Sequence, residues 1–218
     1  MGTRQAVVTG GSSGIGAAIA ARLTAEGIQV HDMSRRTSRV DVTYPRAVRA
    51  VYQGLAEPPE FLVACAGIIE PTPFPAMSVD AWRRVLDVNL TGTFIVAREH
   101  VGRLIAAGRP GKVMLMGSPS GRRPSMDNLA YGVSKAAVLA LGVGLARGLE
   151  GHGIKVYILC PSHVDTPMLR ARGFDNLDSL ALLQPEDLAA EAVRLLLTDN
   201  CLDGQPIYVS QMVLAKQQ

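Results

Sequence analysis

Short apolar runs alternate with longer segments of helical pattern along the whole sequence, and this alternation constrains the fold more than any other feature. The runs are rich in Val, Ile and Leu and predict strands at residues 6–9, 28–34, 61–64, 113–116, 156–159 and 207–209. The segments between them predict helices at residues 15–26, 45–55, 79–107, 129–150 and 185–197. Strands that are apolar on both faces and alternate with helices indicate a parallel sheet covered on both sides. The sequence therefore predicts a doubly wound α/β fold with three layers, in which a sheet lies between two layers of helices.

The composition favours one globular domain that spans residues 1–218. Of the 218 residues, 48% are hydrophobic and 19% are charged, which excludes a mainly disordered chain. No linker or repeat is visible, and no apolar stretch reaches the length of about 18 residues that a membrane-spanning helix needs. The net charge is only +3, and the arginines are scattered, so neither a nucleic-acid partner nor a membrane is expected.

The cysteines and histidines predict neither disulfides nor a metal site. Cys65, Cys160 and Cys201 lie far apart, and none of them has the spacing of metal ligands. The histidines also lack such spacing. Buried thiols in a reducing compartment are the simplest interpretation, and the short polar segment before the first strand shows no secretory signal. We therefore expect a cytoplasmic protein without a metal cofactor.

A glycine-rich loop joins the first predicted strand to the first predicted helix. Its candidate binding residues are Gly10, Ser12, Ser13, Gly14, Ile15 and Gly16. Glycines let the backbone turn sharply and approach a pyrophosphate, while the helix N-terminus offers free N–H groups and a positive dipole end. A flexible turn without a ligand is the alternative interpretation. The position between a strand and a helix favours dinucleotide binding.

Tyr131 and Lys135 open the helix predicted at residues 129–150 and share one of its faces. An ammonium group there could lie below the phenol and lower its pKa from about 10 toward the range useful for general acid–base catalysis. Ser118 follows the strand at 113–116, at the end of the sheet where open α/β folds bind ligands. A Tyr-x-x-x-Lys pattern alone is frequent by chance, but with Ser118 and the glycine loop it becomes a catalytic candidate.

These motifs together resemble the short-chain dehydrogenase/reductase family, and the resemblance covers almost the whole chain. It implies a Rossmann fold and an oxidoreductase that moves a hydride between nicotinamide C4 and a carbonyl or alcohol carbon. It also implies that Ser118 orients the substrate oxygen, Tyr131 transfers its proton, and Lys135 lowers the pKa of the tyrosine and holds the ribose. Asn89, in a Val-Asn-Leu-Thr-Gly match, is expected to break the helix at 79–107 and to hold a water that connects to the lysine.

Further cofactor contacts follow from the same resemblance. The matching positions are Asp41 and Val42 beside the adenine, Cys65, Ala66 and Gly67 after the third strand, and Pro161, Val164 and Thr166 near the nicotinamide. Two of the segments depart from the family, because Cys65 stands where an Asn is usual and Ser162 where a Gly is usual. His163 lies in the nicotinamide loop and is a candidate for contact with the substrate.

The residues after the second strand predict that NADP(H) is favoured, with NAD(H) possible. In NAD-preferring members of the family, an Asp ends this strand and binds the ribose hydroxyls. Here that position is Ser34, and the guanidinium of Arg35 beside it suits a 2′-phosphate. Asp32 lies two positions earlier, and the pleat of the strand is expected to point it back along the sheet. The glycine loop lacks the second basic residue that is common in the family, so the preference is expected to be moderate.

Two regions are shorter than is usual in the family. Only four residues lie between Arg36 and Asp41, so we expect one helix to be deleted and the third strand of the family to shrink to a few residues around Val40. Only seventeen residues lie between Thr166 and Gln184, which leaves little chain for a substrate lid. The active site is therefore expected to be open.

The apolar helices at 79–107 and 129–150 predict a homo-tetramer or a homo-dimer, because members of the family pair them with those of a twofold-related subunit. The other expected partner is a small-molecule carbonyl or alcohol substrate, and no motif selects among the many that the family uses. Two alternatives stay open. One is an NAD-dependent dehydrogenase that works in the oxidative direction, and the other is a catalytically idle protein that senses nucleotides on the same fold.

Overall fold

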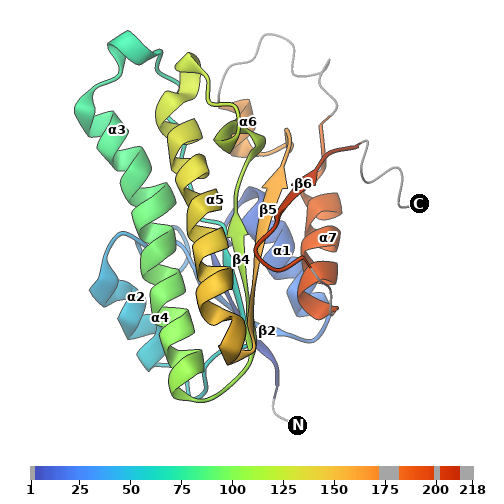
Figure 1. The fold of residues 1–218 in the computed structure, drawn as a ribbon. Helices are drawn as coiled ribbons and strands as arrows, with labels where there is room; N and C mark the ends of the chain where they lie inside the picture. The colour runs from blue at the N-terminus through green and yellow to red at the C-terminus, as the bar shows by residue number, and fades with distance from the viewer. Residues whose placement is uncertain (1–2, 172–181, 199–201, 212–218) are drawn as a thin grey trace.

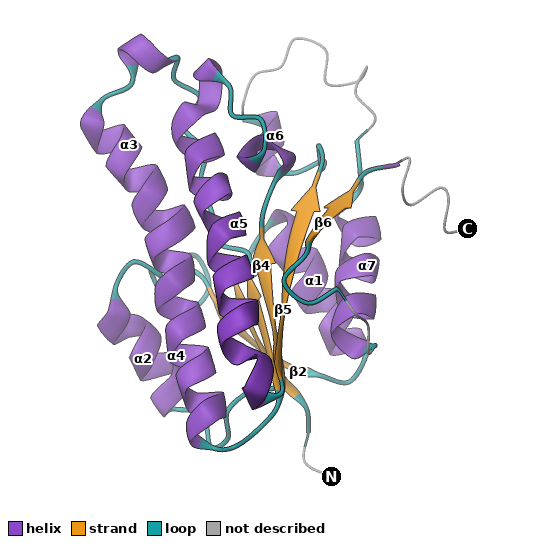
Figure 2. Cartoon of the chain, viewed as in Figure 1, coloured by secondary structure: helices purple, strands orange, loops and turns teal. Residues whose placement is uncertain are grey.

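Six strands form one parallel sheet in the computed structural model, which describes residues 3–171, 182–198 and 202–211 (Figures 1 and 2). The strands are β1 (Gln5–Thr9), β2 (Gln29–Met33), β3 (Phe61–Ala64), β4 (Gly111–Met116), β5 (Ile154–Pro161) and β6 (Pro206–Val209). Their order is β2-β1-β3-β4-β5-β6, and every neighbouring pair is parallel. The chain winds from β1 to β2 on one side and then from β3 onward on the other. The predicted doubly wound, three-layer α/β fold is confirmed.

Helices connect successive strands. They are α1 (Gly14–Ala25), α2 (Pro45–Gln53), α3 (Val79–Leu86), α4 (Thr93–Ala106), α5 (Leu129–Leu149), α6 (Pro167–Arg170) and α7 (Pro185–Leu197). Short 3-10 turns lie at η1 (Phe74–Ala76), η3 (Pro119–Gly121), η4 (Met126–Asn128) and η5 (Glu150–His152). A π-helical turn, η2 (Asp87–Gly92), joins α3 to α4. The interruption predicted near Asn89 is therefore confirmed, in the form of a widened turn within one long helix.

The two faces of the sheet carry separate apolar cores. Successive strand residues point to opposite faces, so Val8 of β1 packs with α1 and α7, while Val7 packs with α2, α4 and α5. Both side chains are fully buried. Figure 1 shows the same division, with α1 and α7 on one side of the strands and α2, α4 and α5 on the other. Coverage of both faces explains why the inner strands β3 and β5 are almost entirely buried. The strand β2, which carries Gln29, His31 and Asp32, is only partly buried.

The strand expected around Val40 does not form, and this prediction was wrong. The chain after β2 turns back on itself, because the amides of Ser38 and Val40 both donate to the carbonyl oxygen of Ser34. Arg39 has a left-handed backbone with φ of 56°. Val40 is buried in the core beneath α2 and α4 without joining the sheet, so β2 is the edge strand of the sheet.

Helix α5 is unusually apolar. With the short turns at its ends, the helical segment Met126–His152 is long and apolar enough to cross a membrane, by length and composition only. Its inner residues Val138, Ala146 and Leu149 are buried in the core against the sheet, and 39% of its most apolar window is buried inside the protein. The inner side of α5 is therefore apolar because it packs in the core.

The shortened lid predicted after Thr166 lies largely outside the described residues.

Candidate active site

Two neighbouring cavities lie at the carboxyl ends of the strands. The larger, of about 310 Å³, is lined by the loop after β1, the ends of β4 and β5, the start of α5 and the segment that leads into α6. The smaller, of about 270 Å³, lies beside the end of β2. They share the lining residues Gly10, Ser13, Ala66 and Gly67. This is the place where the strand order reverses, between β1 and β3, and where open α/β sheets bind ligands.

The glycine loop is shaped to receive a pyrophosphate. Gly10 has φ of +68°, and a Cβ on it would lie 3.0 Å from the Cα of Ala66. A Cβ on Gly16 would lie 2.3 Å from the carbonyl oxygen of Gly10, so the start of α1 can lie under the loop only with glycine there. The side chain of Ser13, at the N-cap of α1, makes no capping hydrogen bond. The first N–H groups of the helix therefore suit an anionic ligand.

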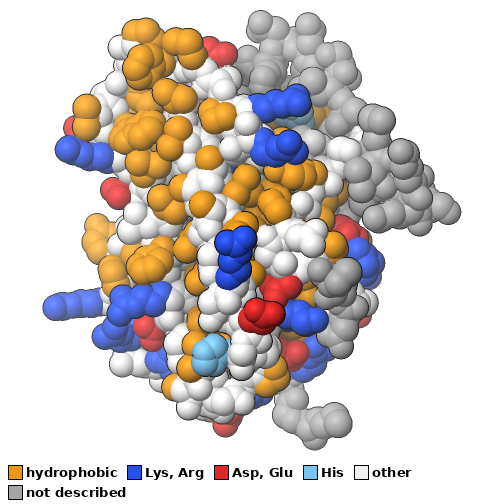
Figure 3. Space-filling view, in the orientation of Figure 1, with side chains coloured by type: hydrophobic (Ala, Val, Ile, Leu, Met, Phe, Trp, Pro, Cys, Tyr) orange, Lys and Arg blue, Asp and Glu red, His pale blue; other side chains and the backbone are white. Residues whose placement is uncertain are grey.

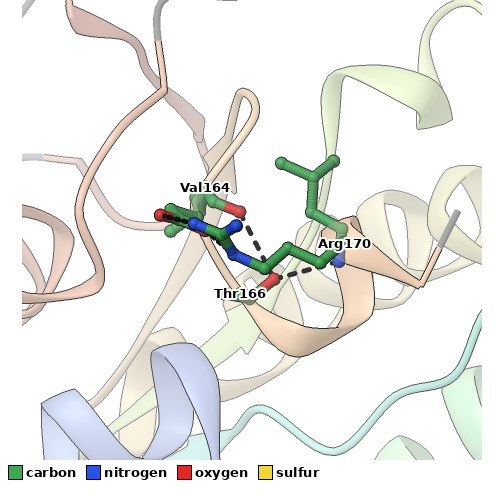
Figure 4. A network of polar contacts seen from close by, with 5 residues as sticks. Val164, Thr166 and Arg170 are labelled. Atoms are coloured by element: carbon green, nitrogen blue, oxygen red, sulfur yellow. Dashed lines mark hydrogen bonds and ion pairs between the residues drawn. The ribbon is translucent and has the colours of Figure 1, made fainter. Parts of the chain in front are cut away.

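Two threonines fix the loop against its neighbours. The hydroxyl of Thr9 accepts hydrogen bonds from the amides of Cys65 and Ala66, at 3.0 and 2.9 Å. These bonds use only the backbone of Cys65, so the segment keeps its place with a cysteine where the family has an asparagine. Thr166 caps α6 by accepting from the amide of Leu169, donates to the carbonyl oxygen of Val164 (Figure 4), and places its methyl group against Gly14.

Ser118, Tyr131 and Lys135 line the larger cavity together. The Nζ atom of Lys135 lies 5.6 Å from the centre of the Tyr131 ring and donates to the carbonyl oxygen of Met116 at 2.8 Å. Ser118 follows β4, and its Oγ accepts from the amide of Ser120 at 3.1 Å. The sequence predicted that these side chains meet at the carboxyl end of the sheet, and the structure brings them there.

Lys135 is buried, and the thiols of Cys65 and Cys160 are close enough to affect its charge. Burial lowers the pKa of its ammonium from 10.5 to about 8, an effect that Cys65 and Cys160 oppose. Burial also raises the pKa of each thiol to about 11, with Lys135 acting in the opposite direction. Both thiols are therefore neutral at physiological pH. The ammonium of Lys135 is the main positive charge at this end of the cavity, which suits a role in stabilising a phenolate.

Asn89 lies behind the cavity wall and lines neither cavity. Its side-chain amide exchanges two hydrogen bonds with the backbone of Ile68, at 2.8 and 2.9 Å, and donates to the Ser134 hydroxyl at 3.0 Å. A Cβ on Gly67 would lie 3.3 Å from Asn89 Oδ1 and 3.8 Å from Lys135 Nζ. Asn89 and Lys135 therefore both lie close to the position that a side chain on Gly67 would occupy. The amide of Asn89 holds the loop after β3 against α5.

The smaller cavity carries the residues predicted for the adenosine end. It is lined by Ser12, Ser34, Arg35, Asp41 and Val42, all predicted, together with Met33, Arg36, Val40, Ile68 and Val88. The Arg35 and Arg36 side chains are exposed, whereas Ser34 and Val42 are buried. Two guanidinium groups at the rim and a small side chain at the strand end leave room for a phosphate.

The direction predicted for Asp32 was wrong. Its carboxylate does not point back along the sheet; it faces the glycine loop, where a Cβ on Gly11 would lie 2.6 Å from its Oδ1 atom. Its Oδ2 atom accepts hydrogen bonds from the hydroxyls of Ser34, at 2.8 Å, and of Thr37. The turn after β2, which brings Thr37 back to the strand, causes this arrangement.

The sequence also matches a family model and several known proteins. A family model described as short chain dehydrogenase matches residues 36–176. The chain belongs to the short-chain dehydrogenase/reductase family. It is 30% identical to human (3R)-3-hydroxyacyl-CoA dehydrogenase over 84% of the chain and 85% of that protein. It is 32% identical to the 3-oxoacyl-acyl-carrier-protein reductase MabA of Mycobacterium tuberculosis, over 78% and 72%.

The fold of a solved family member is also close. A putative NAD(P)-dependent gluconate 5-dehydrogenase from Beutenbergia cavernae, with NADP bound at low occupancy, superposes with a TM-score of 0.86. It is 29% identical in sequence, and the match covers 97% of each chain. As a member of this family of dehydrogenases and reductases, the chain is an oxidoreductase that binds a nicotinamide nucleotide.

Every cofactor contact predicted for this short-chain dehydrogenase/reductase lines one cavity or the other. His163, the candidate substrate contact, lines the larger one. Sequence reasoning missed eight further residues of the wall of the larger cavity, which are Ile69, Met116, Gly117, Pro119, Ser120, Pro167, Met168 and Leu169. Gly117 and Pro119 directly adjoin Ser118, and Pro167 directly follows Thr166, so these neighbours could have indicated them. The others carry no such signal. Within the residues that the structure describes, no three His, Cys, Asp or Glu side chains gather as a metal site would require.

Proposed function

We propose that this enzyme reduces a ketone to an alcohol with NADPH in preference to NADH, and catalyses the reverse oxidation. The observation that carries the proposal is the convergence of Ser118, Tyr131 and Lys135 on a cavity that adjoins the glycine loop. A hydroxyl, a phenol and a buried ammonium supply what proton transfer to a carbonyl oxygen needs, and the loop supplies a place for the nucleotide. The site is proposed to work in the cytoplasm.

In the reducing direction, the substrate oxygen accepts hydrogen bonds from Ser118 and Tyr131. A dihydronicotinamide held beside the glycine loop would supply the hydride for the carbonyl carbon. Tyr131 gives its phenolic proton to the oxygen, so carbonyl, hydride and proton together make the alcohol. The ammonium of Lys135 stabilises the phenolate that remains. In the oxidative direction, a phenolate at Tyr131 would take the proton of the alcohol, and an oxidised nicotinamide would accept the hydride from its carbon.

Lys135 and Asn89 are proposed to return a proton to Tyr131 from solvent. Support comes from their closeness to the position that a Cβ on Gly67 would occupy, because the glycine leaves this space beside both residues open. The Asn89 side chain is already occupied by Ile68 and Ser134. Its part in the relay would therefore be to shape this space and to offer its main-chain carbonyl, which accepts from the Thr93 hydroxyl at 2.7 Å.

The wall of the larger cavity supports a substrate with an apolar body attached to the reacting carbonyl. Ile69, Met168 and Leu169 supply apolar surface, while Ser162 and His163 supply polar side chains to the same wall. A compound with an apolar body and a second polar group near the ketone would contact both the apolar surface and the polar side chains. The human and mycobacterial relatives are named for 3-hydroxyacyl and 3-oxoacyl compounds, so thioesters of this kind head the candidate substrates.

A substrate panel tests the proposed function. Ketones, diketones and 3-oxoacyl thioesters are supplied with NADPH and with NADH, the corresponding alcohols with the oxidised cofactors, and nicotinamide absorbance is followed. We expect turnover of at least one ketone, faster with NADPH. Nucleotide binding without turnover of any compound would contradict the proposal and favour a nucleotide sensor. Faster turnover with alcohols and NAD would favour an oxidative enzyme.

The protein is proposed to form a homo-tetramer through the outer faces of α4 and α5. Phe94 and Ile105 of α4 are 46% and 40% exposed, and Figure 3 shows hydrophobic side chains spread over the face that carries α3, α4 and α5. Gly144 and Gly148 lie one turn apart on α5 with open space around them, which allows a close approach of another helix. Exposed apolar surface of this kind favours association.

Light scattering measures the mass directly. We expect four times the chain mass of 23.1 kDa at micromolar concentration, or twice that mass if the protein is a homo-dimer. Replacement of Phe94 by arginine would place a charge in the interface and should lower the mass. A monomeric mass for the unmodified protein would refute this prediction.

A further inference from the structure

The hydroxyl groups of the turn after β2 donate their hydrogens within the turn itself, two of them to the carboxylate of Asp32. The Oδ2 atom of Asp32 accepts from Ser34 Oγ at 2.8 Å and from the Thr37 hydroxyl, and these two hydroxyl oxygens lie 2.6 Å apart. Because two hydroxyl hydrogens serve these contacts, neither is left for a ligand. Ser38 likewise donates its hydroxyl hydrogen to the carbonyl oxygen of Ser34 at 2.8 Å. Toward a ligand, Ser34 therefore presents an acceptor.

The charge on Asp32 is only partly compensated. Its Oδ1 atom is buried, and no donor from the described part of the chain reaches it. The same atom lies against Gly11 of the glycine loop, and Ser34, which binds the other oxygen, lines the smaller cavity. A carboxylate that is partly withdrawn from water has a field that solvent screens weakly. The adenosine end of the site therefore has Arg35 and Arg36 in its lining and a negative charge behind Ser34.

We propose that Asp32 is a specificity-determining residue that weakens the preference for NADPH and brings NADH into use. This inference rests on the proposed cofactor site. A ribose 2′-hydroxyl can donate to the acceptor that Ser34 presents, whereas a 2′-phosphate offers only acceptors and negative charge. To hold the phosphate, Ser34 must turn its hydrogen away from Asp32, which then loses a charge-assisted hydrogen bond. Asp32 is thus a positioning residue. It orients the hydroxyl of Ser34 and counteracts the attraction of the two guanidinium groups for the phosphate.

The test measures the dissociation constant of NADH divided by that of NADPH in the variants Asp32→Asn and Asp32→Ala. A rise in this ratio means a stronger preference for NADPH. Both changes remove the charge, and the alanine variant also leaves Ser34 without its acceptor. We expect the ratio to rise about tenfold, mainly because NADPH binds more tightly. In these variants, binding of the 2′-phosphate no longer breaks a charge-assisted hydrogen bond from Ser34 to Asp32. Binding is measured by nucleotide fluorescence on the intact oligomer, so no substrate is needed. Thermal unfolding shows that each variant is folded, and the alanine variant serves if the asparagine variant is not.

Two further variants separate this role from a general effect of charge. Asp80→Asn removes the same charge from the exposed first turn of α3 and should leave the ratio unchanged. In a Ser34→Ala background, the effect of Asp32→Asn should shrink, because the hydroxyl through which Asp32 acts is gone.

The outcomes are distinguishable. A ratio that stays the same in both Asp32 variants, or that moves toward NADH, overturns the role of Asp32 while the cofactor site stands. If the unmodified protein binds neither nucleotide, nor 2′,5′-ADP or 5′-ADP as shorter probes, the proposed function fails and this inference fails with it. A rise in the ratio supports the role of Asp32 even if the unmodified protein binds NADH more tightly than NADPH.

Discussion

Replacement of Tyr131 by phenylalanine is expected to lower kcat by about 10²–10⁴-fold, the usual contribution of a general acid–base group. The variant keeps the ring that lies 5.6 Å from Lys135 Nζ and loses only the hydroxyl. Affinity for the nucleotide should change little, since the glycine loop and the residues after β2 are untouched. Initial rates with the best substrate of the panel give kcat, and a fluorescence titration gives the dissociation constant of NADPH.

Tyr44→Phe is the matched control for this variant. Tyr44 precedes α2, is 64% exposed and lines neither cavity, so its loss of a hydroxyl should leave kcat unchanged. If Tyr131→Phe retains more than about a tenth of the unmodified kcat, Tyr131 is not the group that transfers the proton. A loss of activity together with a loss of NADPH binding would instead indicate a damaged site.

The layers of this fold could be predicted because the strands are apolar on both faces, and only a sheet covered on both sides buries such strands. Val7 and Val8 show this most directly, since they are neighbours in sequence and lie in different cores. The region around Val40 could not be predicted in the same way. A β-branched residue favours a strand, but the hydrogen bonds that turn the chain back onto Ser34 place Val40 in the core as part of a loop.

The site was predictable wherever a motif follows a strand, since the carboxyl ends of parallel strands lie at one edge of the sheet. Ser118 and Thr166 are examples, each placed at that edge by the strand before it. What the sequence could not predict depends on contacts between separate turns. The bonds from Asn89 to Ile68 join a π-helical turn to a loop. The direction of Asp32 depends both on the turn that brings Thr37 back to it and on the space that Gly11 leaves for its carboxylate.

Replacement of Arg35 by alanine is expected to weaken NADPH binding by about ten- to a hundredfold and to leave NADH binding nearly unchanged. A hydrogen bond to a charged group contributes about 1.5–3 kcal/mol, and each 1.4 kcal/mol corresponds to about tenfold in affinity. Arg35 is exposed at the rim of the smaller cavity, so the effect should lie toward the lower end and decrease with added salt. Arg36 lines the same cavity and retains part of the attraction for the phosphate.

Arg83→Ala is the control for the loss of one positive charge, because Arg83 lies on α3, is 70% exposed in its side chain and lines neither cavity. It should bind both nucleotides as the unmodified protein does. Equal kcat/KM values for NADPH and NADH in the unmodified enzyme, or a higher value for NADH, would contradict the NADPH preference. The Arg35 and Asp32 variants should move the NADPH to NADH affinity ratio in opposite directions, because the guanidinium attracts the 2′-phosphate that the carboxylate repels. Movement in the same direction would mean that the two side chains do not act on a common phosphate position.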